Sequence, residues 1–125
     1  MSKKTKHILL AEDDEILYTI LLKKLKAEKI KVTLAKDGIK ELQLIKKNIP
    51  DLIIQDLLIP KINGYEILKK IQNNPKLKNI KTIVCSNLSD NTAIKKSKKL
   101  GAVDFLIKSE YSLDEIIKKI TDHLK

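Results

Sequence analysis

The chain has 125 residues, of which 42% are hydrophobic and 34% charged, and its formal net charge is +10. This length suits one domain with a continuous core, and the composition excludes a disordered chain. No apolar run approaches the ~20 residues that a membrane-spanning helix needs. The apolar run nearest the N-terminus is also too short to be the core of a signal peptide. The single cysteine, Cys85, indicates a buried thiol in a reduced, cytoplasmic protein.

The basic charge does not by itself indicate a nucleic-acid-binding protein. All 26 basic residues are lysine, whereas recognition of bases and phosphates relies heavily on the planar arginine guanidinium. Uniform lysine beside abundant isoleucine is typical of a compositional bias. We therefore expect weak, salt-sensitive contact with polyanions, and neither a specific nucleic-acid partner nor a membrane.

Short apolar runs alternate with amphipathic stretches five times along the chain. The apolar runs predict β-strands at residues 7–11, 31–35, 52–55, 82–86 and 103–107. The first helix follows residue 14, with an apolar stripe of Ile16, Leu17, Ile20, Leu21 and Leu25. Further helices are predicted near residues 38–47, 64–73, 90–100 and 113–124. The last begins with the capping-box pattern "SLDE", and Asp14 is expected to cap the first.

Strict alternation of strand and helix predicts an α/β fold with a parallel sheet and right-handed crossovers. Five strands favour the flavodoxin-like (βα)5 architecture with strand order 2-1-3-4-5, as a single domain over residues 1–125. In this topology the ligand crevice lies at the carboxyl ends of the first and third strands, where the strand order reverses.

Polar residues follow the strands at that edge. Glu12, Asp13 and Asp14 come after the first strand, Asp56 ends the third, Ser86 ends the fourth and Lys108 follows the fifth. Converging carboxylates repel one another unless a cation neutralises them, and Mg²⁺ prefers carboxylates, waters and phosphoryl oxygens. We therefore predict a Mg²⁺ site, which could also take Mn²⁺, with ligands from Glu12, Asp13, Asp56 and the Leu58 carbonyl.

An aspartate held beside Mg²⁺ can attack phosphorus and form an aspartyl phosphate. Asp56 is the predicted phosphoacceptor because it is the carboxylate at the end of a strand expected to be fully buried, in "PDLIIQDLLIP". Lys108 would then pair with one phosphoryl oxygen, and the Ser86 hydroxyl would hydrogen-bond another.

These residues resemble the receiver domains of two-component response regulators over almost the whole chain. The matching stretches are "ILLAEDDE", "PDLIIQDLLIPKINGYEIL", "TIVCSN" and "GAVDFLIKS". In chain order they supply Glu12, Asp13, Asp56, Pro60, Gly64, Ser86, Phe105 and Lys108. The resemblance implies a histidine kinase or phosphotransfer protein as phosphodonor. It also implies a switch in which Ser86 moves toward the phosphoryl group and Phe105 turns inward.

The sequence departs from the family pattern at several positions. Ser109 replaces the usual proline after the lysine, which favours a trans peptide bond there. Glu12 replaces the commoner aspartate, and Asn63 stands where aspartate is usual before Gly64. Leu58 and Leu88 occupy positions that border the phosphoryl group in this family. We expect these leucines to obstruct water and lengthen the lifetime of the phosphorylated state.

The resemblance implies a signalling switch rather than a turnover enzyme. We expect a stand-alone receiver, a monomer or weak dimer, with no output domain. Its signal would leave through the predicted helix at residues 90–100, the strand at 103–107 and the last helix, toward an unknown downstream protein. A kinase would dock near Ile16 and Leu17.

Other readings remain open. The chain could be a degenerate receiver that binds partners without phosphorylation, although the intact set of site residues argues against this. An aspartyl phosphatase would need a second aspartate where Leu58 stands. A flavin-binding protein would need a phosphate-cradling loop in place of "AEDDE".

Overall fold

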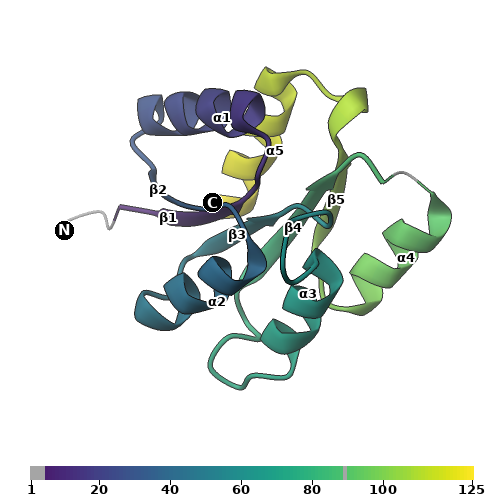
Figure 1. Ribbon diagram of the computed structural model, residues 1–125. Helices are drawn as coiled ribbons and strands as arrows, with labels where there is room; N and C mark the ends of the chain where they lie inside the picture. The colour runs from purple at the N-terminus through teal and green to yellow at the C-terminus, as the bar shows by residue number, and fades with distance from the viewer. Residues whose placement is uncertain (1–4, 89) are drawn as a thin grey trace.

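The computed structural model describes residues 5–88 and 90–125. Five parallel strands form one sheet in the order β2-β1-β3-β4-β5, with helices on both faces (Figure 1). The strands are β1 (His7–Ala11), β2 (Lys31–Ala35), β3 (Leu52–Gln55), β4 (Lys81–Ser86) and β5 (Asp104–Ile107). The helices are α1 (Glu15–Ala27), α2 (Gly38–Lys47), α3 (Gly64–Gln72), α4 (Asn91–Lys99), α5 (Leu113–Leu124) and the short 3₁₀ helix η1 (Lys108–Glu110). The predicted fold and strand order are confirmed.

The apolar core is divided by the sheet, because alternate side chains of each strand face opposite sides. On β1, Ile8 and Leu10 pack into the cluster shared with α1 and α5. Leu9 and Ala11 pack into the cluster shared with α2 and α3. Figure 1 shows the same division, with α1 and α5 over one face and α2 and α3 over the other. A third cluster joins β4 and β5 to α3 and α4.

The helix starts follow the local capping chemistry that the sequence predicts. Asp14 accepts a hydrogen bond from the Leu17 amide at 3.2 Å, so it caps α1. Ser112 and Glu115 form the reciprocal capping box at the start of α5. Asn63 accepts from the Glu66 amide at 3.1 Å and thereby keeps the turn chemistry that aspartate would supply. Each such cap stabilises its helix by about 1 kcal/mol.

The predicted apolar stripe of α1 is only partly buried. Ile16 is 77% exposed, whereas Leu21 and Leu25 are completely buried. Leu21 and Leu25 lie four residues apart and define the buried face of α1. Ile16 precedes Leu21 by five residues, which places it roughly 140° around the helix from that face. Ile16 therefore faces solvent in the first turn, beside the carboxyl end of the sheet.

The loop after β3 folds back tightly before α3 begins. The Gly64 amide donates to the Leu57 carbonyl at 2.9 Å. A Cβ atom on Gly64 would lie 2.6 Å from the Asp56 carbonyl oxygen and equally close to the Leu57 Cα. Glycine is therefore required here by close backbone approach, and this approach shapes the segment that follows Asp56. Within the described residues, no helix has the length and apolar character to cross a membrane.

Candidate functional site

The predicted site residues meet at the carboxyl edge of the sheet, because parallel strands all end on the same side. Glu12 and Asp13 follow β1, Asp56 follows β3, and Lys108 follows β5. Backbone pairing holds this edge in register beyond the strands themselves. The Glu12 amide donates to the Ala35 carbonyl at 3.0 Å, and the Asp56 amide donates to the Ala11 carbonyl at 3.0 Å. The two carboxylates therefore project from rigid strand ends.

Three carboxylates form a compact oxygen cluster at this edge. One oxygen each of Glu12, Asp13 and Asp56 can be chosen so that all three lie within 4.8 Å of one another. Glu12 and Asp56 are buried and Asp13 is exposed. Hard carboxylate oxygens with one side open to solvent suit Mg²⁺, which keeps several waters in its coordination shell. The donor set therefore fits a divalent cation.

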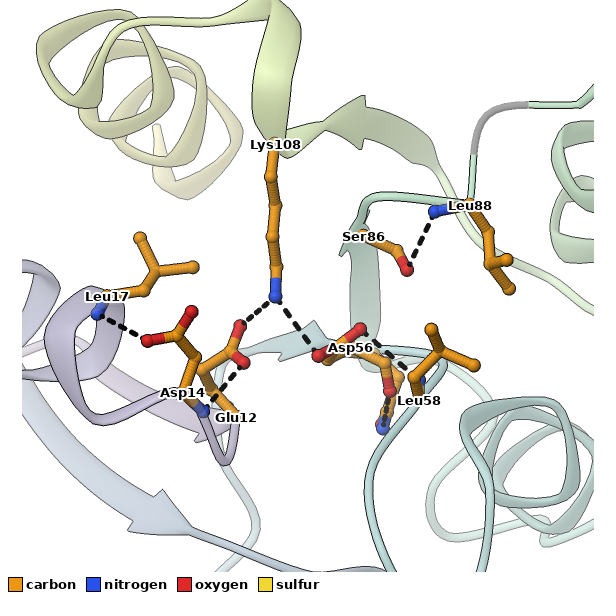
Figure 2. A network of polar contacts seen from close by, with 9 residues as sticks. Glu12, Asp14, Leu17, Asp56, Leu58, Ser86, Leu88 and Lys108 are labelled. Carbon is orange, nitrogen blue, oxygen red and sulfur yellow. Dashed lines mark hydrogen bonds and ion pairs between the residues drawn. The ribbon is translucent and has the colours of Figure 1, made fainter.

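Lys108 bridges the two buried carboxylates. Its Nζ lies 2.7 Å from Glu12 Oε1 and 3.1 Å from Asp56 Oδ2, and Figure 2 shows the ammonium between the two acids. Burial by itself lowers the pKa of Lys108, but the hydrogen bond to Glu12 and the charges of Asp56 and Glu12 outweigh burial and raise it. Lys108 is therefore a permanent cation, and the ionised cluster retains two negative charges, which a divalent cation would neutralise.

The ionised form of Glu12 is disfavoured by its surroundings. Burial raises its pKa to about 7, and the nearby charge of Asp56 adds to the increase, although the hydrogen bond from Lys108 opposes it. The Asp14 amide donates to Glu12 Oε2 at 3.2 Å, so the carboxylate is held in place on both oxygens. A cation bound at this cluster would lower the pKa of Glu12 by stabilising its ionised form.

The Asp56 carboxylate is oriented by one contact on each oxygen. Oδ2 meets Lys108, and Oδ1 accepts a hydrogen bond from the Leu58 amide at 3.2 Å. The Leu58 side chain is 60% exposed and stands at the rim of the site. The predicted metal-binding role of the Leu58 carbonyl stays a prediction.

Ser86 and Phe105 lie on the side of the site that faces α4. Ser86 is completely buried, and its Oγ accepts a hydrogen bond from the Leu88 amide at 3.4 Å, as Figure 2 shows. Among the described residues, no hydrogen bond joins Ser86 to Asp56 or Lys108. Phe105 is buried in the cluster that contains Ala93 of α4 and Val84 of β4. Its side chain thus already lies inside.

The segment after β5 contains a trans peptide bond and a short helical turn. No peptide bond of the described residues is cis, so the bond before Ser109 is trans, as the sequence predicts. Residues Lys108–Glu110 form η1. This single 3₁₀ turn begins at the lysine that reaches into the site.

Sequence reasoning missed two buried polar residues beneath the site. Gln55 Nε2 donates to the Asp56 carbonyl at 3.0 Å, and Glu41 of α2 is completely buried. Both were visible as polar residues within apolar patterns, Gln55 in the strand "LIIQ" and Glu41 one turn before Ile45. Periodicity alone could not show that they lie in the same layer.

Comparisons with known proteins show the family to which the chain is related. The response regulator receiver domain family model matches residues 8–121. The two-component response regulator ORR11 of Oryza sativa is 32% identical over 104 residues, which cover 82% of this chain and 70% of that protein. The Mn²⁺-bound response regulator Rcp1 is 27% identical with a TM-score of 0.82, over 94% of this chain and 90% of that one. The phosphorylated cyanobacterial phytochrome response regulator RcpA is 27% identical with a TM-score of 0.85, over 95% and 93%. The chain therefore belongs to the response regulator receiver domain family.

Proposed function

We propose that the chain is a phosphorylatable receiver in which Asp56 accepts a phosphoryl group from the phosphohistidine of a histidine kinase or phosphotransfer protein. The observation that carries this proposal is the arrangement of Lys108, whose Nζ contacts Glu12 at 2.7 Å and Asp56 at 3.1 Å. This arrangement places a carboxylate nucleophile, Asp56, beside a cation, Lys108, and next to the acidic cluster that would bind the metal.

Phosphoryl transfer needs positioning and charge neutralisation more than covalent chemistry from the protein. An Asp56 oxygen forms a bond to phosphorus while the bond from phosphorus to the donor imidazole nitrogen breaks, and the imidazole leaves as a neutral base after protonation. Lys108 neutralises one phosphoryl oxygen from its place beside Asp56 Oδ2. The Ser86 hydroxyl accepts from the Leu88 amide, so its own proton is available to donate to a second phosphoryl oxygen.

Glu12, Asp13, Asp56 and the Leu58 carbonyl would hold the metal. When bound, Mg²⁺ neutralises charge on the transferring phosphoryl group. The relative Rcp1 binds Mn²⁺ and the relative RcpA is phosphorylated, which supports both parts of the proposal for this chain, with Mn²⁺ as a substitute ion.

The signal would leave through α4, β5 and α5. Phe105 packs in one cluster with Ala93 of α4, so a movement of Ser86 that shifts α4 would change the packing around this aromatic ring. Because Phe105 is already inside, the change would consist of repacking around it rather than entry from solvent. The phosphodonor would dock on the exposed apolar residues beside the site, Ile16 and Leu58.

A receiver that binds partners without phosphorylation is the alternative function. It is not favoured, because such a protein has no need for a partly buried lysine bridging two buried acids. Such a cluster carries a desolvation cost, which a phosphorylation site would justify.

The test is intact-protein mass after incubation with acetyl phosphate and Mg²⁺. We expect the gain of one phosphoryl group in the natural protein and in the control Asp122→Asn, which changes an exposed aspartate on α5. We expect no gain in Asp56→Asn or with a metal chelator. Absence of any gain, together with absence of Mg²⁺ binding by titration calorimetry, would support the phosphorylation-independent module instead.

A further inference from the structure

Two polar side chains lie completely buried beneath the phosphoacceptor, where an apolar layer would be expected. Glu41 and Gln55 each have an exposed fraction of 0%. Glu41 lies one turn before Ile45 on the buried face of α2, and Gln55 lies two residues after Ile53 on the same face of β3. Ile45 and Ile53 belong to one apolar cluster. The two polar side chains therefore share the layer between α2 and the sheet.

The hydrogen bonds of this pair are incomplete. Gln55 Nε2 donates to the Asp56 carbonyl oxygen at 3.0 Å. Because a carbonyl oxygen only accepts, this bond determines the orientation of the amide and leaves Gln55 Oε1 free. Gln55 Oε1 and both carboxyl oxygens of Glu41 have no hydrogen-bond partner among the described residues. Three buried acceptor atoms thus lack a donor, which is costly in a protein interior.

A proton on Glu41 supplies the missing donor. Burial raises the pKa of Glu41 to about 8, and the neighbouring Gln55 side chain partly opposes this increase. No charged group of the described residues contributes to it, so no cation is at hand to pair with an ionised carboxylate. A neutral carboxyl group carries an O–H that can donate to Gln55 Oε1.

We propose that Glu41 is a neutral carboxylic acid that donates to Gln55 Oε1 and thereby holds the Gln55 amide against the Asp56 carbonyl. Glu41 is then a positioning residue for the phosphoacceptor, an inference that rests on the proposed role of Asp56. The same helix is tied to the loop beyond Asp56, since the Gly38 amide donates to the Pro60 carbonyl at 3.0 Å. Helix α2 thus supports Asp56 through the strand before it and the loop after it.

Loss of the Glu41 proton has a definite structural consequence. A carboxylate can only accept, so it would repel Gln55 Oε1 and attract Gln55 Nε2. The amide would turn over, the Asp56 carbonyl would lose its donor, and Oε1 would then face that carbonyl. The rate of Asp56 phosphorylation is therefore expected to fall once Glu41 ionises.

The first test measures protonation directly, without any phosphodonor. Carbon-13 NMR of the Glu41 carboxyl group in the natural protein should show it neutral at pH 6 and titrating near pH 8. The Asp56 carbonyl shift should move with the same midpoint, because its hydrogen bond depends on the same proton. The proposal would be overturned if Glu41 titrated in the ordinary acidic range. It would also be overturned if the chemical shift of the Asp56 carbonyl did not change as Glu41 titrates.

The second test compares phosphorylation rates with acetyl phosphate and Mg²⁺ from pH 6 to 9.5. Glu41→Gln keeps a donor for Gln55 Oε1 and should retain the natural rate at pH 6, without the additional loss above pH 8. Glu41→Leu removes the donor and should lower the rate roughly two- to ten-fold at pH 6, the factor that one hydrogen bond contributes. Glu66→Gln, an exposed position on α3, is the matched control and should follow the natural profile.

The two variants distinguish positioning from mere packing. Equal rates and equal Asp56 carbonyl shifts in Glu41→Leu and the natural protein would overturn the proposal. If neither the natural protein nor any variant is phosphorylated, the proposed function is wrong. The NMR titration still decides whether Glu41 is neutral and bonded to Gln55.

Discussion

Replacement of Glu41 by glutamine should remove a large pH dependence from the stability of the fold. The pKa of Glu41 is raised by burial from its ordinary value of 4.5 to about 8 in the folded protein. Between these values the folded state binds one more proton than the unfolded state. The free energy of unfolding therefore falls by about 1.4 kcal/mol per pH unit through this window. It is highest below the unfolded pKa and levels off above the folded one.

Over the whole window this amounts to about 5 kcal/mol, a large share of the roughly 5–15 kcal/mol that typically stabilises a domain. Glutamine has the same shape and no charge, so Glu41→Gln lacks this loss. We expect the variant to match the natural protein near pH 4, to exceed it by about 3 kcal/mol at pH 7, and to reach a constant excess above pH 8.

Urea unfolding of both proteins at pH 5, 6, 7, 8 and 9, followed by circular dichroism, measures the two stabilities. The difference between them isolates Glu41, because every other titrating group is shared and cancels. A difference that stays constant from pH 5 to 8 would refute the reasoning, since it would mean that Glu41 is ionised in the folded state.

Three further predictions concern the site itself. Leu58→Asn should shorten the lifetime of the phosphorylated protein after removal of the phosphodonor, because an amide can hold a water where the leucine excludes it; an already fast decay that the variant does not accelerate would contradict this. Lys108→Ala should tighten Mg²⁺ binding in titration calorimetry, since it removes the cation between Glu12 and Asp56. The same variant should be labelled less by acetyl phosphate. Weaker Mg²⁺ binding would show that the lysine organises the acids rather than competing with the ion. Gly64→Ala should lower both stability and labelling, because its Cβ would lie 2.6 Å from the Asp56 carbonyl oxygen; a normal melting temperature would show that the loop can relax.

The sequence alone was sufficient to predict the architecture and to predict which acidic residues lie at the carboxyl edge of the sheet. Alternating apolar runs and amphipathic stretches are local patterns, and parallel topology then requires every strand to end at the same edge. Helix starts at Asp14 and Ser112 were equally accessible, because a capping side chain bonds to an amide only three residues away.

Tertiary structure decided what depends on neighbours distant in the sequence. Periodicity placed Ile16 on one apolar stripe with Leu21 and Leu25, and only the packing of α1 shows that Ile16 faces solvent while the two leucines are buried. The sequence indicated that Phe105 could turn inward, and only the packing of α4 against β5 shows it already there. The contact of Lys108 with Glu12 joins residues almost a hundred positions apart, so no local pattern could specify its distance.

The Glu41–Gln55 pair shows this division most clearly. The sequence shows a glutamate and a glutamine within apolar patterns, but it does not show that the two side chains lie in one layer. Only when α2 packs on the sheet do they meet in a layer without water, where burial changes the pKa of one and directs the amide of the other toward Asp56. Local sequence determines which elements form, whereas burial, and hence the protonation and orientation of polar groups, arises only from the packing of those elements.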